Sequence, residues 1–303
     1  MHRRWSMVLA LRIFLLVPVS LVFSPIAAMA QSAGGSGHAR PITAREVIER
    51  IKAHVGVPWQ QDTVDTFKAG DPDTRVTGIA VTMMATLDVL QRAAAAGQNL
   101  VITHEPTFYN HLDHADEIPQ KENDPVLAQK LAFIKEHNLV VWRFHDHWHA
   151  RNPDGIEVGM IRALGWEKFQ DKQNPYLFTI PETTLEKLAA ELKSRRQLRT
   201  MRVVGDRTMK LTRIALSPGA AGLQTEVRAL EIPDVQLLIT GESREWETVE
   251  YAADAVSEKR QKALIVLGHI PSEQAGMEEC VRWLKPMVPE VAVEFVPAEQ
   301  PFW

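Results

Sequence analysis

Short apolar runs that alternate with helical segments constrain the fold of this chain more than any other feature. The runs NLVITHEP, LVVWRFH and ALIVLGHIP are apolar stretches of strand length. The segments LDVLQRAAAAG and PVLAQKLAFIKEHN, which precede the first two of these runs, are typical of helices. Helices and strands in this alternation are the pattern of a parallel sheet covered by helices. The sequence therefore predicts an α/β fold.

A change in composition at residues 171–175 predicts a domain boundary. The segments YLFTI, TTLEKLAAELKSRR, MRVVG and LTRIALSPG follow it and predict a second αβ unit. From VQLLITGES onward the chain again alternates apolar strand runs with helical segments, as in its first part. Its last helix is expected to begin at Ser272. We therefore expect one αβ domain from residues 43–170 together with 234–303, and a smaller αβ unit from residues 171–233.

The first 30 residues have the pattern of a secretory signal peptide. A basic start and an apolar stretch lead to AMA, a small-x-small cleavage motif that ends at Ala30. Pro18 and Pro25 interrupt the apolar stretch, which disfavours the alternative of a membrane anchor. Residues 31–42 follow as a polar, flexible leader. We expect a periplasmic or secreted protein that has no membrane attachment after the signal is removed.

Charge and cysteine content exclude several classes of partner and of stabilising bond. The signal contains three of the 34 basic residues and none of the 38 acidic ones, so the mature chain carries a net charge of −7. This balance argues against nucleic acid or an anionic membrane as a partner. The single cysteine, Cys280, cannot form an intramolecular disulfide. Packing, metal or assembly must therefore stabilise the fold.

Three of the apolar runs end in side chains that bind metals. They are His104 and Glu105, then His145, Asp146, His147 and His149, and finally His269 and Glu273. In an open α/β sheet, ligands bind at the carboxyl ends of strands, so we expect these groups to meet in one crevice. Imidazole and carboxylate together suit zinc, manganese, iron or nickel better than calcium or magnesium. The sequence predicts a divalent metal site.

Each of these groups also has a purely structural interpretation. A lone histidine at a strand end, such as His104, is commonly a hydrogen-bonded core residue. Pro271 and a helix-capping Ser272 explain the spacing of His269 and Glu273 without a metal. The cluster from 145 to 149 could be a solvated loop. Three such coincidences at one topological position favour the metal site.

The motifs THEPTF, FHDHWHA followed by PDG, LLITGES and LGHIPSEQAG occur in an order that resembles the NIF-three-like dinuclear metal-centre family. Some members of that family are named type 2 GTP cyclohydrolase I. The similarity covers most of the chain from about Thr43. It implies two αβ units with mixed sheets flanked by helices, one or two divalent ions per chain, and a homohexamer. The signal peptide would make this chain an exported variant.

The resemblance also implies a set of ligands. In the family pattern two adjacent histidines end the first strand, an aspartate follows the histidine of the second by four residues, and His-x-x-x-Glu closes the site. Carried over, the metal ligands are His104, Glu105, His149, His269 and Glu273. Glu105 replaces the second histidine, and His149 stands where the aspartate would be. An imidazole cannot bridge two ions, so Glu105 or Glu273 must bridge, or the site holds one metal.

Glu105, Glu242 and His145 are the candidate catalytic residues. His145, Asp146 and His147 are interpreted as residues that orient the ligands or transfer protons. His147 could instead form a His-x-His pair with the histidine two residues on, as in amidohydrolase-type sites. Glu242, in TGES, lies at another strand end, where it could act as a base or cap the following helix.

The predicted function is metal-assisted hydrolysis of a small-molecule phosphoester, amide or nucleotide-type ring by activated water. Opening of the GTP ring, which the family resemblance implies, is disfavoured because an exported protein would meet little GTP. The sequence also contains no glycine-rich phosphate loop. The alternative is a non-enzymatic periplasmic metal-binding carrier. Stoichiometric metal binding without turnover would distinguish the carrier from the enzyme.

Overall fold

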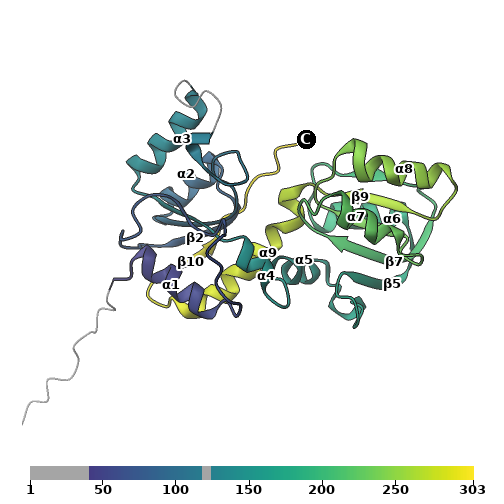
Figure 1. The fold of residues 1–303 in the computed structure, drawn as a ribbon, viewed down its shortest axis with the longest axis horizontal. Coiled ribbons are helices and arrows are strands. Elements are labelled where there is room, and N and C mark those ends of the chain that lie inside the picture. The colour runs from purple at the N-terminus through teal and green to yellow at the C-terminus, as the bar shows by residue number, and fades with distance from the viewer. Residues whose placement is uncertain (1–40, 118–123) are drawn as a thin grey trace, which may run out of the picture. The chain divides into compact units, whose positions relative to one another are not determined.

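Two five-stranded mixed sheets form the framework of the protein. The structure, a computed structural model, describes residues 41–117 and 124–303, so the predicted signal peptide and nearly all of the leader lie outside the described residues. The first sheet has the strand order β1-β4-β3-β2-β10, and the second has the order β5-β7-β8-β9-β6. Helices pack beside both sheets (Figure 1). The predicted α/β class, with two αβ units and mixed sheets flanked by helices, is confirmed.

In both sheets parallel strands form the centre and antiparallel strands lie at an edge. The first contains β1 (Phe67–Ala69), β2 (Ile79–Met84), β3 (Leu100–Glu105), β4 (Val140–Arg143) and β10 (Val293–Phe295). The second contains β5 (Leu177–Thr184), β6 (Arg202–Val204), β7 (Lys210–Ser217), β8 (Leu237–Thr240) and β9 (Ala263–Val266). Strand β1 runs antiparallel to β4, as do β5 to β7 and β6 to β9. All other pairs are parallel, so the carboxyl ends of the central strands share one edge in each sheet.

Nine α-helices of the described residues connect and cover these strands. They are α1 (Ala44–His54), α2 (Leu87–Ala95), α3 (Pro125–Glu136), α4 (Asp146–Ala150), α5 (Gly155–Leu164), α6 (Leu185–Arg195), α7 (Leu223–Glu231), α8 (Glu250–Ser257) and α9 (His269–Leu284). A π-helical stretch, η4 (Glu245–Val249), precedes α8. A capping box begins α1, because Thr43 and Glu46 each accept a hydrogen bond from the other's backbone N–H. None of the helices among the described residues has the length and apolarity needed to cross a bilayer.

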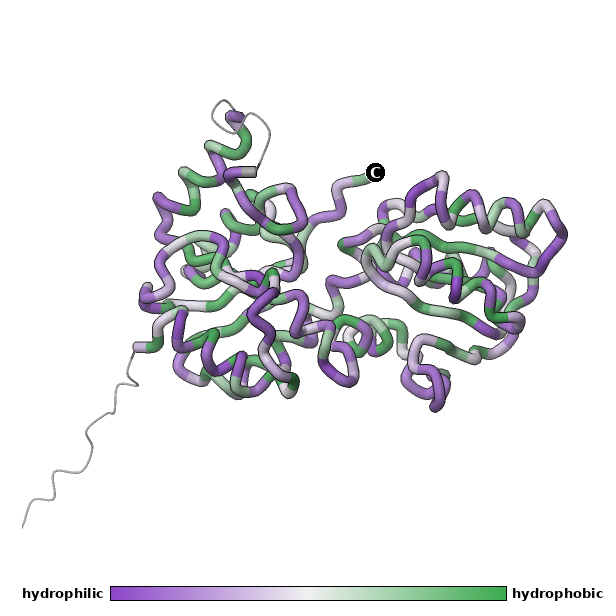
Figure 2. Tube along the Cα trace, viewed as in Figure 1, coloured by the Kyte–Doolittle hydropathy of each residue, from purple (hydrophilic) through white to green (hydrophobic). Residues whose placement is uncertain are grey.

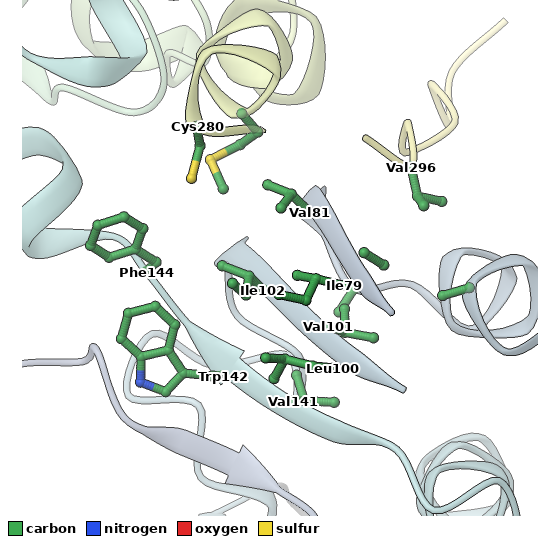
Figure 3. Close-up of a cluster of buried hydrophobic side chains, with 14 of the residues drawn as sticks. Ile79, Val81, Leu100, Val101, Ile102, Val141, Trp142, Phe144, Cys280 and Val296 are labelled. Carbon is green, nitrogen blue, oxygen red and sulfur yellow. The ribbon is translucent and has the colours of Figure 1, made fainter. Parts of the chain in front are cut away.

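The first sheet is buried on both faces. Strands β2 and β3 consist almost entirely of buried residues, as expected for a parallel sheet covered by helices on each side. Figure 1 shows α1 and α9 on one side of this sheet and α2 and α3 on the other. In Figure 3, Val81 and Ile102 project from neighbouring strands toward the side where Cys280 of α9 lies. Cys280, the single cysteine, is a free thiol that is buried in this core as an apolar side chain.

The second sheet has a different core on each face. Leu237 and Ile239 of β8 belong to one hydrophobic cluster, and Leu238 between them belongs to another on the opposite face. This alternation follows from the two-residue period of a strand. Hydrophobic residues concentrate along the strands, whereas the helices alternate between hydrophobic and hydrophilic residues (Figure 2).

Strand pairing divides the chain differently from the expected boundaries. Residues 234–303 were predicted to return to the first unit, yet β8 and β9 pair within the second sheet, parallel to β7. The return occurs later, where α9 contributes Met277 and Leu284 to the core of the first sheet and β10 pairs with β2. Apolar strand runs in sequence show where strands lie but not which neighbour they pair with.

Helix α9 begins at His269, three residues before the predicted start at Ser272. Pro271 is tolerated there because the N–H groups of the first helical turn have no partner within the helix. Since β9 lies in the second sheet and the body of α9 packs on the first, this helix start lies between the two sheets. The shift makes His269 the first residue of a long helix and puts Glu273 one turn further along.

Helices α5 and α9 cross in close contact through glycines. A Cβ atom added to Gly159 would overlap the carbonyl of Ala275, and one added to Gly276 would overlap the backbone of Ile156. Only hydrogen at these positions lets the two backbones approach so closely. The crossing therefore fixes α9 relative to α5, whose N-terminal end lies beside the histidine cluster.

Gly159→Ala should destabilise the protein by about 1–2 kcal/mol, because overpacking against backbone atoms costs about 2–3 kcal/mol and only roughly 1 kcal/mol is regained in helix propensity. Ser194→Ala, a small exposed helical residue in α6, serves as the control and should change the free energy of unfolding by no more than about 0.5 kcal/mol. Urea unfolding followed by circular dichroism measures both. A Gly159→Ala protein as stable as the control would contradict this packing.

Candidate metal centre

Two histidines of the first sheet are held through the same ring nitrogen. His104, fully buried in β3, places Nδ1 3.0 Å from the carbonyl oxygen of Phe144. His145, which follows β4, places Nδ1 2.9 Å from Oδ1 of Asp146. A carbonyl or carboxylate oxygen can only accept, so each Nδ1 carries the proton and donates. The Nε2 atom of each ring is thereby left to present a lone pair.

The other two histidines of the cluster follow the same rule. His149, in α4, donates from Nδ1 to Asp154 Oδ2 at 2.8 Å. His269, at the start of α9, donates from Nδ1 to Glu242 Oε2 at 3.0 Å. An outward hydrogen bond from one ring nitrogen, which fixes the tautomer and directs the other nitrogen inward, is the usual support for a metal-binding histidine.

The inward Nε2 atoms meet two carboxylates in a small space. His104 Nε2 lies 3.1 Å from His149 Nε2 and 3.5 Å from Glu273 Oε2. His269 Nε2 lies 3.2 Å from the same Glu273 oxygen and 3.4 Å from Glu105 Oε1. The Glu105 oxygen is in turn 3.6 Å from His145 Nε2. Two triplets have ligand atoms within 4.8 Å of one another, namely His104 with His145 and His149, and His104 with Glu105 and Glu273.

This arrangement requires a positive charge among the ligand atoms. Two neutral imidazoles whose Nδ1 atoms both donate outward would face each other with lone pairs only 3.1 Å apart. The buried Glu273 Oε2 accepts no hydrogen bond from any group in residues 41–117 and 124–303. Burial lowers the pKa of His104 well below its ordinary value, so this ring stays neutral. The donor set of neutral imidazoles and buried carboxylates fits a divalent ion of the zinc, manganese, iron or nickel type.

Without a metal, the chain must supply that charge as protons. Burial lowers the pKa of His269, but the carboxylates of Glu105, Glu242 and Glu273, whose oxygens lie 3.4, 3.0 and 3.2 Å from its ring nitrogens, outweigh it and raise the pKa to about 12. Burial opposes ionisation of Glu105, yet the histidines around it hold its pKa below the ordinary value. The cluster therefore retains protonated imidazole at neutral pH when it is metal-free. A divalent ion that binds there must displace those protons, which couples metal affinity to pH.

Two buried residues that the sequence analysis did not single out hold the site in place. Asp65 accepts hydrogen bonds from the backbone N–H groups of His145 at 2.6 Å, of Asp146 at 3.0 Å and of His147 at 2.9 Å. It thereby fixes the turn between β4 and α4. Its carboxylate also accepts from Nδ1 of His147 at 2.7 Å. A single aspartate far from the histidines in sequence carries no motif that could have revealed this contact.

Arg143 is the second such residue. Its guanidinium, completely buried, donates to the carbonyl oxygens of His104 and His111 and lies 3.4 Å from Glu105 Oε2. It therefore ties β4 to the end of β3 and occupies one oxygen of Glu105. A buried arginine at the end of an apolar strand was the available signal, since such a charge needs a partner.

Two residues of the His145–His149 cluster lie outside the donor set. His147 turns away, since its Nδ1 bonds to Asp65, its Nε2 accepts from the N–H of Gln60, and its ring stacks on Trp59 at 3.6 Å. The alternative His-x-His pair therefore does not converge on one point. Asp146 orients His145, as predicted for a supporting residue, and is itself fixed by Thr63 and the N–H of Val64.

The structure thus brings together every predicted ligand and every candidate catalytic residue. His104, Glu105, His149, His269 and Glu273 line one cluster, with His145 among the donors and Glu242 behind His269. Glu242 pairs with Nδ1 of His269 rather than facing the other ligand atoms, so the structure favours an orienting contact. The metal-binding and catalytic roles themselves remain predictions.

Comparisons with known proteins agree with this fold. A family model described as Duf34/NIF3 (NGG1p interacting factor 3) matches residues 41–301. A GTP cyclohydrolase 1 type 2 homolog from Chlamydia muridarum is 22% identical over 241 residues, which is 78% of this chain and 90% of the relative. The predicted resemblance to the NIF-three-like family is confirmed by these matches.

Solved structures show the same fold at low identity. A hypothetical protein from Staphylococcus aureus has a TM-score of 0.69 at 20% identity, and the match covers 87% of this chain and 99% of that protein. A Bacillus cereus protein related to NIF3 has a TM-score of 0.68 at 13% identity, again over 87% and 99%. Likeness at these identities concerns the fold alone.

Asp65→Asn should lower the free energy of unfolding by about 2–4 kcal/mol, because an amide offers one acceptor oxygen where the carboxylate offers two. It should also weaken metal binding roughly 10–100-fold by loosening the turn that carries His145. Calorimetric titration with zinc and urea unfolding measure the two effects. Asp62→Asn, an exposed neighbour, is the matched control. Wild-type zinc affinity in Asp65→Asn would contradict the positioning role.

Glu157, on α5 beside the cluster, should make the metal-free protein less stable as the pH rises. Burial, together with the charge of Asp154, raises the pKa of Glu157 from 4.5 to about 8. Between these values the unfolded chain releases a proton that the folded chain keeps, so rising pH favours unfolding.

Glu157→Gln, which has no titratable proton, should remove this effect. Relative to the wild type, its free energy of unfolding in chelator should gain on the order of 1 kcal/mol or more between pH 5 and pH 8. Urea unfolding at several pH values measures the difference. Parallel pH profiles for the two proteins would contradict the prediction.

Proposed function

The chain belongs to the Duf34/NIF3 (NGG1p interacting factor 3) family, and on that premise we propose that it is a metal-dependent hydrolase. One or two divalent ions would activate water against a small-molecule phosphoester, amide or nucleotide-type ring. The single observation that carries the proposal is the set of four histidines that donate outward from Nδ1 and aim Nε2 at two buried carboxylates. The name of the Chlamydia muridarum relative, GTP cyclohydrolase 1 type 2 homolog, supports hydrolytic chemistry.

When bound, a divalent ion lowers the pKa of coordinated water and polarises the oxygen of the bond to be broken. The ligands would be Nε2 of His104, His149 and His269 with the carboxylates of Glu105 and Glu273. Arg143 already engages one oxygen of Glu105, whereas both oxygens of Glu273 face histidines, one of them His149 at 4.0 Å. Glu273 would therefore have both of its oxygens available to hold metal, whereas Glu105 would have one.

Proton transfer would fall to His145. Its Nε2 lies at the edge of the ligand cluster, and Asp146 orients the ring through Nδ1. The His145 side chain is partly exposed and lines a cavity, so it can reach a substrate and exchange protons with solvent. Glu242 would keep the tautomer of His269 that presents Nε2 to the metal. We further propose, from the sequence and the family resemblance, that the protein is exported to the periplasm or beyond and assembles as a hexamer.

Metal content and turnover test the proposal together. Elemental analysis of the mature protein should give one or two zinc or manganese ions per chain. His104→Ala and His269→Ala should lose at least one of them and reduce kcat/KM for an activated phosphodiester about 10²-fold or more. His137→Ala, an exposed histidine on another helix end, is the control and should keep both properties.

Two results would overturn the proposal in different ways. Stoichiometric metal with no turnover of any phosphoester, amide or purine-ring substrate would favour the metal carrier. Full metal content in both His104→Ala and His269→Ala would show that the metal binds elsewhere.

A further inference from the structure

A cavity of about 590 Å³ opens directly from the histidine cluster. One end is lined by the ligand candidates Glu105, His149 and His269, and the cavity continues between β7 and α7. Its size is that of a site for a small organic molecule. The cavity is therefore continuous with the proposed reaction centre, and a molecule bound in it would reach the ligand atoms.

The middle of the cavity is apolar. Leu177 of β5, Ala215 and Leu216 of β7, and Ile232 after α7 line it. Ala215 and Leu177 pair across the two strands, so they form one patch on the sheet. Such a surface favours the hydrocarbon or aromatic body of a ligand, because it removes apolar area from water. A small inorganic ion would leave this part of the cavity unused.

Among the described residues that line the cavity, Arg228 is the one lysine or arginine. Arg228, on α7, makes no hydrogen bond or ion pair within residues 41–117 and 124–303. Several arginines of the described chain, such as Arg45 and Arg50, are instead paired with carboxylates. The guanidinium is thus free to bind an oxyanion through two parallel hydrogen bonds.

The cavity wall formed by the start of α5 does not pair with Arg228. Asp154, which lines it, is engaged by the ring of His149. Glu157 stands next to it, and its raised pKa leaves it largely uncharged at neutral pH. Asn174 and Tyr176 add neutral polar groups to that wall. An anion near Arg228 therefore meets one fixed positive charge and no competing ion pair.

We propose that this cavity binds an amphipathic organic oxyanion, whose carboxylate or phosphate pairs with Arg228 and whose apolar body covers the Leu177 and Ala215 patch. That this oxyanion is the substrate rests on the proposed function, since the bond to be hydrolysed would lie at the histidine end of the cavity. That it binds in the cavity does not depend on hydrolysis. The class excludes bare inorganic ions and uncharged apolar compounds as preferred ligands.

Binding to the metal-free mature protein tests the subsite apart from catalysis. The probes are 4-phenylbutyrate, 3-phenylpropyl phosphate and the neutral 4-phenylbutyramide, titrated calorimetrically in chelator. Both anions should bind at least about 10-fold more tightly than the amide, because a charge-assisted hydrogen bond to Arg228 is available to the anions alone. The tighter of the two anions identifies a carboxylate or a phosphate as the natural group.

Arg228→Gln should lose this preference. Its affinity for the anions should fall about 10-fold or more, its affinity for the amide should stay the same, and its metal content should not change. Arg207→Gln, an exposed arginine away from the cavity, is the matched control and should bind all probes as the wild type does. Thr225→Trp, which fills the cavity one turn before Arg228, should weaken anions and amide alike.

The outcomes separate this inference from the proposed function. Equal anion affinity in Arg228→Gln and wild type would overturn the subsite, as would no binding of either anion at millimolar concentration. Anion binding that depends on Arg228, in a protein that loads metal but turns nothing over, would sustain the subsite and overturn the hydrolase.

Discussion

The structure depends most on the need to place positive charge between two buried carboxylates and four inward-facing imidazoles. Glu105 and Glu273 are buried, and the rings of the histidines near them are held by outward hydrogen bonds. In a region of low dielectric such carboxylates are costly unless a cation or proton balances them. The chain has fixed the donors in advance, so a metal that binds finds its ligands already oriented.

The fold meets this need by joining two sheets at their carboxyl edges. His104 and Glu105 end β3, His145 and His149 follow β4, and Glu242 and His269 follow β8 and β9 of the other sheet. Helix α9 starts at the second sheet and packs on the first, and its glycine contact with α5 sets how closely the two helices approach. Residues with purely structural contacts, Asp65 and Arg143 among them, therefore control the geometry of the ligands.

The cavity connects the histidine cluster with the apolar patch and with Arg228. Ligand atoms occupy one end, an apolar patch on β5 and β7 forms the middle, and Arg228 of α7 lies on its wall. The apolar patch and Arg228 both come from residues 171–233, which the sequence predicts as a second, smaller αβ unit. Residues that follow the strands of the first sheet thus supply several of the groups that could hold a metal, and the second sheet supplies the apolar wall of the cavity.

The sequence alone determined the α/β class, most strands and helices, and the residue types of the site, because apolar periodicity and His/Glu spacing are local properties. Tertiary structure decided what depends on long-range pairing. It placed β8 and β9 in the second sheet, turned His147 away from its neighbours, and brought Asp65 and Arg143 to the ligands. The start of α9 at His269, three residues before the capping signal at Ser272, was likewise not visible in the local sequence, because the N-cap residue, Gly268, makes no side-chain capping bond. Which ring nitrogen faces inward was also beyond the sequence, because the partner oxygens, such as those of Phe144 and Glu242, come from distant segments.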